Sequence, residues 1–490
     1  MTSDAAAAEV APSPSVTAPQ ELARALTLRD SIALVLTVIG TGVFLKAAPM
    51  AQLVGSPSKV LFAWLAAGLL SLAGALTYAE LGAMMPEAGG EYVFLREAYG
   101  DLAGFLFGWT SVMLIASGGL AAVSNAVASF LAAFVKLDSV WLTRDLHLLG
   151  QTVHWQLGGQ QLVAVAIILL FAAINARGLE LGGKVQWAVT VAKVAGIAVI
   201  VLGAFLLSKT GSWEHLKKPV TAEIGPSGIG AFGAAMIASL WAYQGWSNLP
   251  MVAGEIEKPE RNIPRALIYG MLLVILVYVV ANIAFFYALP FGEVLTANST
   301  QYRNALPVAS KAALTFSSYG PQLVSLAFMI AAVGALNGIT LMNARVPFAM
   351  ARNGLFFRPL GLLSDRRVPA RAIWFQALWA CLLALSGTFD QITTSVIFAV
   401  WLFTALVGSS LFVLRRKLPA APRRYRAIGY PVVPAIFVLV AAWLVINSLS
   451  ATPVESAAGL LLIAIGLPFF LFFRATRHDV HAEEEAVTPS

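Results

Sequence analysis

Charged side chains are scarce in this sequence, and long apolar runs separate them. Asp, Glu, Lys and Arg make up 12% of the 490 residues, whereas 59% are hydrophobic. A water-soluble chain typically carries about 25% charged residues. Apolar runs of roughly 20 residues, the length that crosses a bilayer, recur along most of the chain. The composition therefore predicts a polytopic helical membrane protein.

Cysteine is nearly absent, and histidine is rare. The single cysteine, Cys381, cannot form an intramolecular disulfide. None of the five histidines falls in a predicted span; they are His147, His154, His215, His478 and His481. We therefore expect neither a histidine proton relay nor a metal site within the membrane, and no cofactor.

The apolar runs divide the chain into twelve predicted spans with a polar tail at each end. Residues 1–20 lack the basic start and apolar core of a signal peptide, so we expect the first span to stay in the mature protein. We expect residues 1–28 to form a disordered tail. The predicted organisation is five spans in 29–207, a loop at 208–228, five spans in 229–414, a basic loop at 415–430, two spans in 431–475 and a tail at 476–490. The individual spans are 29–53, 57–84, 100–136, 157–175, 183–207, 229–253, 265–290, 320–350, 370–388, 392–414, 431–449 and 456–475.

The distribution of basic residues sets the predicted orientation. If the amino terminus is cytoplasmic, most of the 32 Lys and Arg residues fall in cytoplasmic segments, as the positive-inside rule requires. We therefore expect both termini in the cytoplasm, loop 208–228 outside the cell, and a multi-pass protein of the plasma (cell inner) membrane. This topology accounts for the net charge of +7, which thus gives no reason to expect nucleic acid as a partner. The expected surroundings are the lipid bilayer.

Glycine interrupts the first predicted span at its middle. Gly40 and Gly42 flank Thr41 in "VIGTGVF", where no water can satisfy an exposed amide. A gap there must line a cavity, and glycine would let a ligand approach the backbone; the alternative is a glycine pair that only packs two helices closely. A second interruption, "SLWAYQGWSNLP" at 239–250, opens the second block of five spans. Paired interruptions are typical of inverted-repeat transporters.

The chemistry of the two gaps favours an α-amino acid as ligand. An interrupted helix leaves free carbonyls where its first segment ends and free amides where its second begins. The amides that could hold a carboxylate are those of Thr41, Gly42 and Val43. The carbonyls that could hold an ammonium are those of Val38, Trp241 and Ala242. Such a site recognises both charges of a zwitterion without a buried ionised side chain.

Four stretches together resemble a known family of transporters. They are "GTGVF" (40–44), "TYAELGAMMPEAGGEYVFLREAYG" (77–100), "WAYQGWSNLPMVAGEIEKPERNIPRA" (241–266) and "ARNGLFFRPLGLLSDRRVPARA" (351–372). The chain resembles the amino acid–polyamine–organocation (APC) superfamily, and within it the L-type amino acid transporters and their bacterial relatives. The resemblance implies an all-α membrane fold with a five-plus-five inverted repeat, discontinuous helices 1 and 6, and two appended helices. It also implies alternating access rather than enzymatic chemistry.

The resemblance assigns roles to residues at both gaps. It implies carboxylate contacts at Thr41 and Gly42, a turn shaped by Gly40, and amine contacts at the carbonyls of Val38, Trp241 and Ala242. The Trp241 ring would close over the substrate, and the pocket beyond it would include Gln244, Ser247 and Asn248. Gln244 lies where some L-type members have glycine. Its larger side chain would occupy part of the pocket, which disfavours a large aromatic substrate. Loop 137–156 lacks the cysteine that links eukaryotic members to a glycoprotein, so no disulfide-linked heavy subunit is expected.

Lys193 lies near the middle of the fifth predicted span, where an ammonium is costly by roughly 2.5–3.5 kcal/mol. A structural ion pair or a lysine that extends to the surface is the alternative to a functional role. The resemblance implies that this lysine substitutes for a sodium ion, bonding to span 1 carbonyls and to the region of 334–338. It could also release a proton, so proton-coupled uptake and sodium-independent exchange both remain open.

Glu80 is the other acid associated with a span, near the cytoplasmic end of the second. We expect it to bind loop amides or a basic residue as part of an inner gate.

The predicted function is transport of amino acids, with neutral L-amino acids as the substrates that the resemblance implies. A cationic amino acid or polyamine antiporter would favour an acid in the pocket, and 38–44 and 239–250 contain none. A sensor that binds an amino acid without transporting it is the alternative from a different class, and the sequence does not separate the two.

Overall fold

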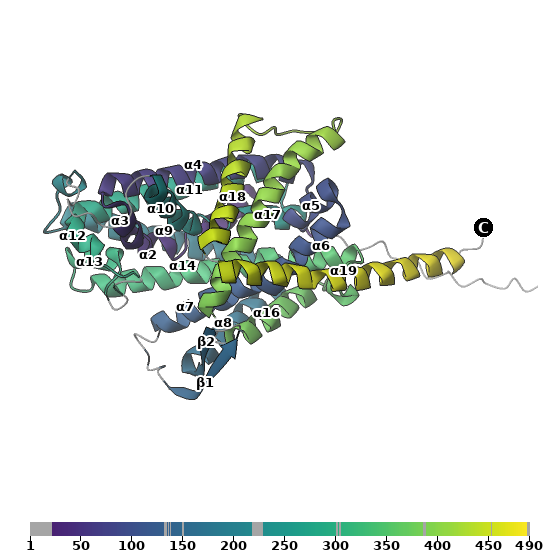
Figure 1. The fold of residues 1–490 in the computed structure, drawn as a ribbon, viewed down its shortest axis with the longest axis horizontal. Helices are drawn as coiled ribbons and strands as arrows, with labels where there is room; N and C mark the ends of the chain where they lie inside the picture. Colours follow the sequence, from purple (N-terminus) through teal and green to yellow (C-terminus); the bar gives the residue numbers. More distant parts are fainter. Residues whose placement is uncertain are drawn as a thin grey trace, which may run out of the picture.

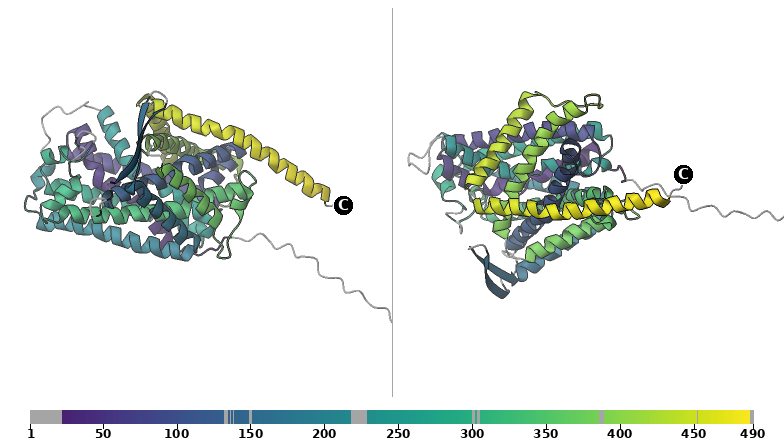
Figure 2. Two further views of the ribbon diagram at one scale, coloured as in Figure 1. Left: turned by 90° about the horizontal axis from the view of Figure 1, so that it is seen from below. Right: turned by 45° about the vertical axis from the view of Figure 1, so that its right-hand side comes forward.

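The computed structural model describes residues 22–131, 135, 137, 139–148, 151–217, 229–299, 302, 305–385, 389–451 and 453–487. These residues form a bundle of helices with one hairpin at its side, and the last helix leaves the bundle at one end (Figures 1 and 2). Most of the predicted amino-terminal tail, residues 1–21, lies outside the described part, as do residues 218–228 of the predicted outer loop.

The described helices account for all twelve predicted spans. Ten helical segments are long and apolar enough to cross a membrane, and α16 (Ala370–Leu385) is a shorter apolar helix. The remaining span is the interrupted pair α10 (Ile229–Ala242) and η4 (Trp246–Glu255). Large apolar side chains remain exposed on the outer faces; Leu206 is 74% and Leu439 69% exposed. Such faces suit lipid rather than water, so the chain folds as the predicted all-α membrane protein.

The first five spans begin with an interrupted helix and continue through long ones. The interrupted span consists of α1 (Leu28–Val35), η1 (Leu36–Val38), α2 (Gly42–Leu45) and α3 (Ala47–Val54). It is followed by α4 (Pro57–Met84), α5 (Glu91–Tyr99), α6 (Asp101–Thr110), the π-helical stretch η2 (Ser111–Ile115), α7 (Ala116–Leu131), β1 (Val140–Leu148), β2 (Gln151–Gly158), α8 (Gly159–Ala176), α9 (Leu179–Leu207) and η3 (Trp213–Leu216).

The second block also begins with an interrupted helix, the α10 and η4 pair. It continues with α11 (Pro259–Ala288), α12 (Phe291–Leu295), α13 (Val308–Leu314), α14 (Gly320–Asn343), α15 (Arg345–Arg352), η5 (Arg358–Gly361), α16 and α17 (Phe389–Lys417). The appended helices are α18 (Val432–Ala451) and α19 (Pro453–Val487). In Figure 1, α17 and α18 lie side by side across the long helices α4 and α11.

Two segments differ from the expectation of irregular structure. Loop 137–156 contains the antiparallel hairpin of β1 and β2, paired from Val140 with Gly158 to Leu148 with Gln151. The two strands contain several β-branched and aromatic residues, which favour strands. Helix α19 runs through Val487, beyond the expected end at 475. The Ala and Glu residues of that segment are good helix formers, so the helix continues past the apolar part.

Candidate functional site

The first span is interrupted where the sequence predicts it. Helix η1 ends at Val38, Ile39 leaves the helical region with φ −69° and ψ 85°, and α2 starts at Gly42. A helix leaves its first amides without partners inside the helix, so the start of α2 presents free N–H groups. These are among the amides that we predicted to hold a carboxylate.

The second gap lies between α10 and η4. Helix α10 ends at Ala242, and Tyr243, Gln244 and Gly245 form a turn before η4 begins. Gly245 has φ 117°, a conformation that favours glycine. Pro250 lies inside η4 and cannot donate to a helical hydrogen bond, which contributes to the irregular winding of this half of the span.

The two gaps touch each other. A Cβ atom added at Gly42 would lie 2.9 Å from Cα of Ala242, closer than real Cβ atoms come. The Tyr278 hydroxyl of α11 lies 2.8 Å from the Val38 carbonyl oxygen and 2.9 Å from that of Ala242, and can donate its proton to either. Two of the three predicted ammonium-binding carbonyls thus converge on one point. Sequence reasoning missed Tyr278, because nothing in the apolar run of span 7 shows which way the ring faces.

The other predicted contacts surround this point. The third carbonyl, that of Trp241, accepts a hydrogen bond from the Gln244 amide at 3.4 Å. The Trp241 ring lies next to Gly42, and the Lys46 ammonium is 4.5 Å from its centroid, in the range of a cation–π contact. Gly40 is less crowded, because the nearest neighbour of an added Cβ would be the Val38 carbonyl at 3.7 Å.

Three polar residues were predicted to line the pocket beyond Trp241. All three are half-buried and lie at the second gap: Gln244, Ser247 and Asn248.

Lys193 is fully buried on α9 and reaches the first interrupted span. Its ammonium donates to the Leu36 carbonyl of η1 at 2.6 Å. A Cβ at Gly334 of α14 would lie 3.7 Å from Lys193 Nζ, so α14 packs directly against the ammonium. The structure therefore brings together the three elements that the sequence analysis expected this lysine to join.

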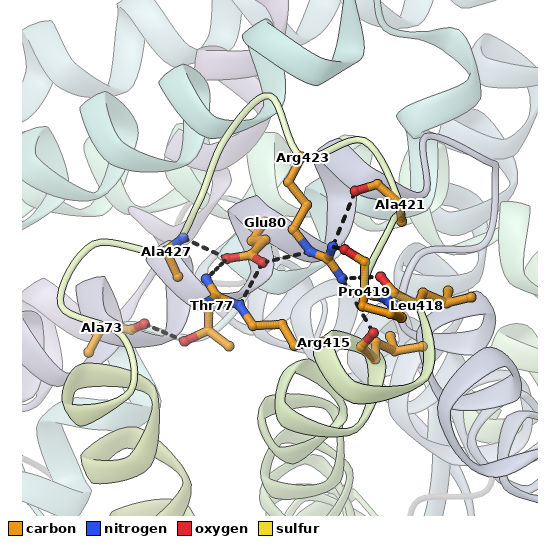
Figure 3. A network of polar contacts seen from close by, with 10 residues as sticks. Ala73, Thr77, Glu80, Arg415, Leu418, Pro419, Ala421, Arg423 and Ala427 are labelled. Atoms are coloured by element: carbon orange, nitrogen blue, oxygen red, sulfur yellow. Dashed lines mark hydrogen bonds and ion pairs between the residues drawn. The ribbon is translucent and has the colours of Figure 1, made fainter.

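Glu80 is held by the last turn of α17 and by the basic loop that follows it (Figure 3). Arg415 donates two hydrogen bonds to its carboxylate, at 2.9 and 2.6 Å. The Ala427 amide donates a third at 2.6 Å, and Arg423 lies 3.4 Å away. Both a loop amide and basic residues were expected, but the sequence did not indicate which arginines would supply them.

A second buried ion pair was missed altogether. Arg345, at the start of α15, donates two hydrogen bonds of 2.7 and 2.8 Å to Glu255, at the end of η4. Both side chains are buried. This pair ties η4, the second half of the interrupted span 6, to α15 at the end of span 8. Loss of one partner would leave an uncompensated buried charge.

Glu91, at the start of α5, is a further buried acid that sequence reasoning missed. The Tyr78 hydroxyl donates to its carboxylate at 2.7 Å, and the Ser247 hydroxyl faces the same group. The Tyr78 ring also packs edge-on against Trp246, with centroids 4.9 Å apart. Burial raises the pKa of Glu91 from 4.5 to about 7, while the two hydroxyls oppose that shift. The network connects a titratable group to the second gap.

Glu91→Gln should flatten the pH dependence of thermal stability. Between the unfolded pKa of 4.5 and the folded pKa of about 7, the folded protein holds a proton that the unfolded chain has released. The stabilising contribution of this group is therefore complete below that window and is lost as pH rises through it. Thermal unfolding of the purified protein at several pH values should show the variant gaining stability relative to the parent as pH rises. Glu97→Gln in the same helix is the control, and a parallel change in both variants would contradict the assignment.

The arrangement defines a class of protein. An all-α bundle of twelve spans, in which the first and sixth are interrupted where they touch, is the architecture of a secondary transporter with its site at the broken helices. The chain belongs to the amino acid permease family, which matches residues 26–472. It is therefore an amino acid transporter of the APC superfamily and not an enzyme.

Similar proteins include exchangers and transporters of several amino acids. The chain is 32% identical to the serine/threonine exchanger SteT of Bacillus subtilis (strain 168), over 89% of this chain and 93% of that protein. It is 29% identical to the human b(0,+)-type amino acid transporter 1, over 92% of this chain and 88% of the relative. It is 26% identical to the human cystine/glutamate transporter, over 92% and 86%.

Proposed function

We propose that the protein carries neutral L-amino acids across the plasma membrane by alternating access, through sodium-independent exchange or proton-coupled uptake. The observation that carries the proposal is the meeting of the two gaps, where the carbonyls of Val38 and Ala242 converge close to the free amides of α2. A zwitterion could bind there with its carboxylate on the amides of Thr41, Gly42 and Val43 and its ammonium on the carbonyls, including that of Trp241.

The remaining roles follow from position. Gln244, Ser247 and Asn248 would contact the substrate side chain, and the ring of Trp241 would close over the substrate. Glu80 would hold the inner gate through its bonds to Arg415 and Ala427. In this proposal both termini are cytoplasmic, Gly40 shapes the first turn, Lys193 takes the place of a coupling ion, and the protein works without a disulfide-linked heavy subunit.

The charges near the site favour a neutral substrate over a cationic one. Lys46 lies over the Trp241 ring and Lys193 bonds to the first interrupted span, so two ammonium groups would repel a cationic side chain. The Glu91 carboxylate contacts the pocket residue Ser247, and the Tyr78 hydroxyl already donates a hydrogen bond to it. The similarity to a serine/threonine exchanger also supports a small neutral side chain.

Uptake of labelled amino acids into proteoliposomes tests the proposal. Uptake that requires internal amino acid indicates exchange, and uptake driven by a pH gradient alone indicates proton coupling. Binding without uptake under either condition would instead identify a sensor. Labelled serine, threonine, arginine and putrescine should be compared, because preference for the last two would favour a cationic amino acid or polyamine antiporter and contradict the neutral assignment.

Trp241→Ala should slow transport more than it weakens binding. If the ring closes over the substrate, its loss impairs the closing step, and we expect the uptake rate to fall on the order of tenfold. Substrate-induced stabilisation of the purified protein should persist, because the backbone contacts remain. Trp374→Ala, on the exposed face of α16, is the matched control. An equal loss of binding and rate would make the ring a binding contact rather than a gate.

A further inference from the structure

Two cavities flank the last span where it leaves the bundle. The first has a volume of about 610 Å³ and lies between α15, η5 and α19. The second, of about 580 Å³, lies between α19 and the turn that joins α5 to α6. Arg477 lines both of them. Neither cavity includes a residue of the substrate site, so the function proposed above does not account for them.

Among the side chains that the structure describes, three arginines and no acid line the first cavity. They are Arg352, Arg358 and Arg477. The second cavity adds Arg474 and one acid, Asp101, whose carboxylate lies 3.2 Å from the Arg477 guanidinium. Positive charge therefore exceeds negative charge among the described side chains of the two cavities. Guanidinium groups suit phosphate because they are planar, always charged and able to donate two parallel hydrogen bonds.

The turn before η5 positions Arg477. Gly354 has φ 69°, and a Cβ there would lie 3.1 Å from Cγ of Arg477 and 3.3 Å from Cδ. The aliphatic part of the arginine thus packs on bare backbone, and this close approach directs its guanidinium toward the cavity rim and Asp101.

The wall of the first cavity is aromatic and continuous with the outer surface of α19. The Phe473 ring packs against Phe356 and Phe357, with centroids 5.6 and 5.2 Å apart. Phe357 is 47% exposed, and Phe472, on the same turn of α19, is 60% exposed. Leu471 beside them is 63% exposed. A basic cavity therefore opens onto an apolar surface at the end of a membrane span.

We propose that the first cavity binds an anionic phospholipid, with its phosphate held by Arg358 and Arg477 and an acyl chain lying along Phe472. A soluble phosphate compound would use the arginines but not the exposed rings. Basic pockets between spans at the cytoplasmic surface are sites for anionic headgroups, and aromatic side chains gather at the same depth. Arg352 would add charge at the rim. The proposal concerns lipid binding and does not rest on the substrate or the transport mechanism.

Native mass spectrometry of the protein released from mixed phosphatidylglycerol and phosphatidylcholine nanodiscs tests this site. The parent protein should retain phosphatidylglycerol in preference to phosphatidylcholine. The double variant Arg358→Gln/Arg477→Gln should bind it roughly ten- to thirtyfold more weakly, since each basic residue contributes to attraction for an anionic headgroup. The single variant Arg358→Gln should show an intermediate loss, and because Arg358 is exposed its removal leaves the packing of α19 unchanged.

Arg261→Gln/Arg265→Gln is the matched control, because it removes the same charge from exposed positions at the start of α11. The control should retain phosphatidylglycerol like the parent. Equal retention by the pocket and control variants would overturn the proposal. Displacement of the lipid by low concentrations of inorganic phosphate would also overturn it, because the site would then recognise a free phosphate rather than a lipid.

Discussion

Gly42→Val is expected to abolish substrate binding while leaving membrane insertion intact. A Cβ atom at this position would already lie 2.9 Å from Cα of Ala242, and the branched valine side chain would push the two gaps apart. It would also cover the amides at the start of α2, where we propose that the carboxylate binds. Substrate-induced thermal stabilisation of the purified protein should disappear, and uptake into proteoliposomes with it.

Gly230→Val separates a specific effect from general damage to the interrupted spans. It is the same substitution at an exposed position near the start of α10, where an added Cβ would meet no atom within 4 Å. We expect binding within about twofold of the parent, the usual range for a substitution without a steric or hydrogen-bonding conflict. If Gly42→Val bound substrate with normal affinity, or if both variants lost it equally, the backbone site would be in the wrong place.

The two gaps could be predicted from the sequence because helix-breaking residues are unusual in the middle of a membrane span. A helix in hydrocarbon has no water to satisfy its backbone, so glycine pairs and a turn-forming segment at mid-span stand out. The partners of Lys193 had a different source: the cost of a buried ammonium predicted only that it has partners, and the family resemblance implied that these include carbonyls of span 1. The structure has that bond, to Leu36.

The residues that were missed depend on contacts between distant segments. Tyr278 lies in an apolar run, and only the rotation of α11 aims its hydroxyl at both gaps. Glu91 follows two glycines in what reads as a polar loop; it is buried because the Gly89 amide bonds to the Met251 carbonyl at 2.9 Å and draws the loop against η4. No local pattern distinguishes such an acid from a solvated one, since burial is set by the neighbouring helix rather than by its own segment.

The ion pair of Arg345 and Glu255 illustrates the same limit. Glu255 ends η4 and Arg345 begins α15, positions where a charge ordinarily faces water. The two residues are 90 positions apart in the sequence, yet both side chains are buried in contact with each other. Glu80 was predicted in part: its position near the cytoplasmic end of span 2 predicted loop amides or a basic residue as partners. That Arg415 is the bidentate partner depends on how the last turn of α17 packs against α4.

Lys193→Ala should stop the transport cycle or remove its response to pH, while substrate still binds. The ammonium donates to the Leu36 carbonyl at 2.6 Å and lies against α14, so it links the first interrupted span to α14. Its loss would remove one donor from that carbonyl, which also accepts from the Ile39 amide at 3.0 Å, and would shift the balance between the two states of the carrier. Lys184→Ala is the control: it is the same substitution on the same helix, at a side chain that is 79% exposed. Initial uptake rates measured across a pH series should distinguish the Lys193→Ala variant from the Lys184→Ala variant.

If uptake by the Lys193→Ala variant matched the parent at every pH, this lysine would have no role in the mechanism. A loss of uptake limited to Lys193→Ala would support coupling through the first interrupted span.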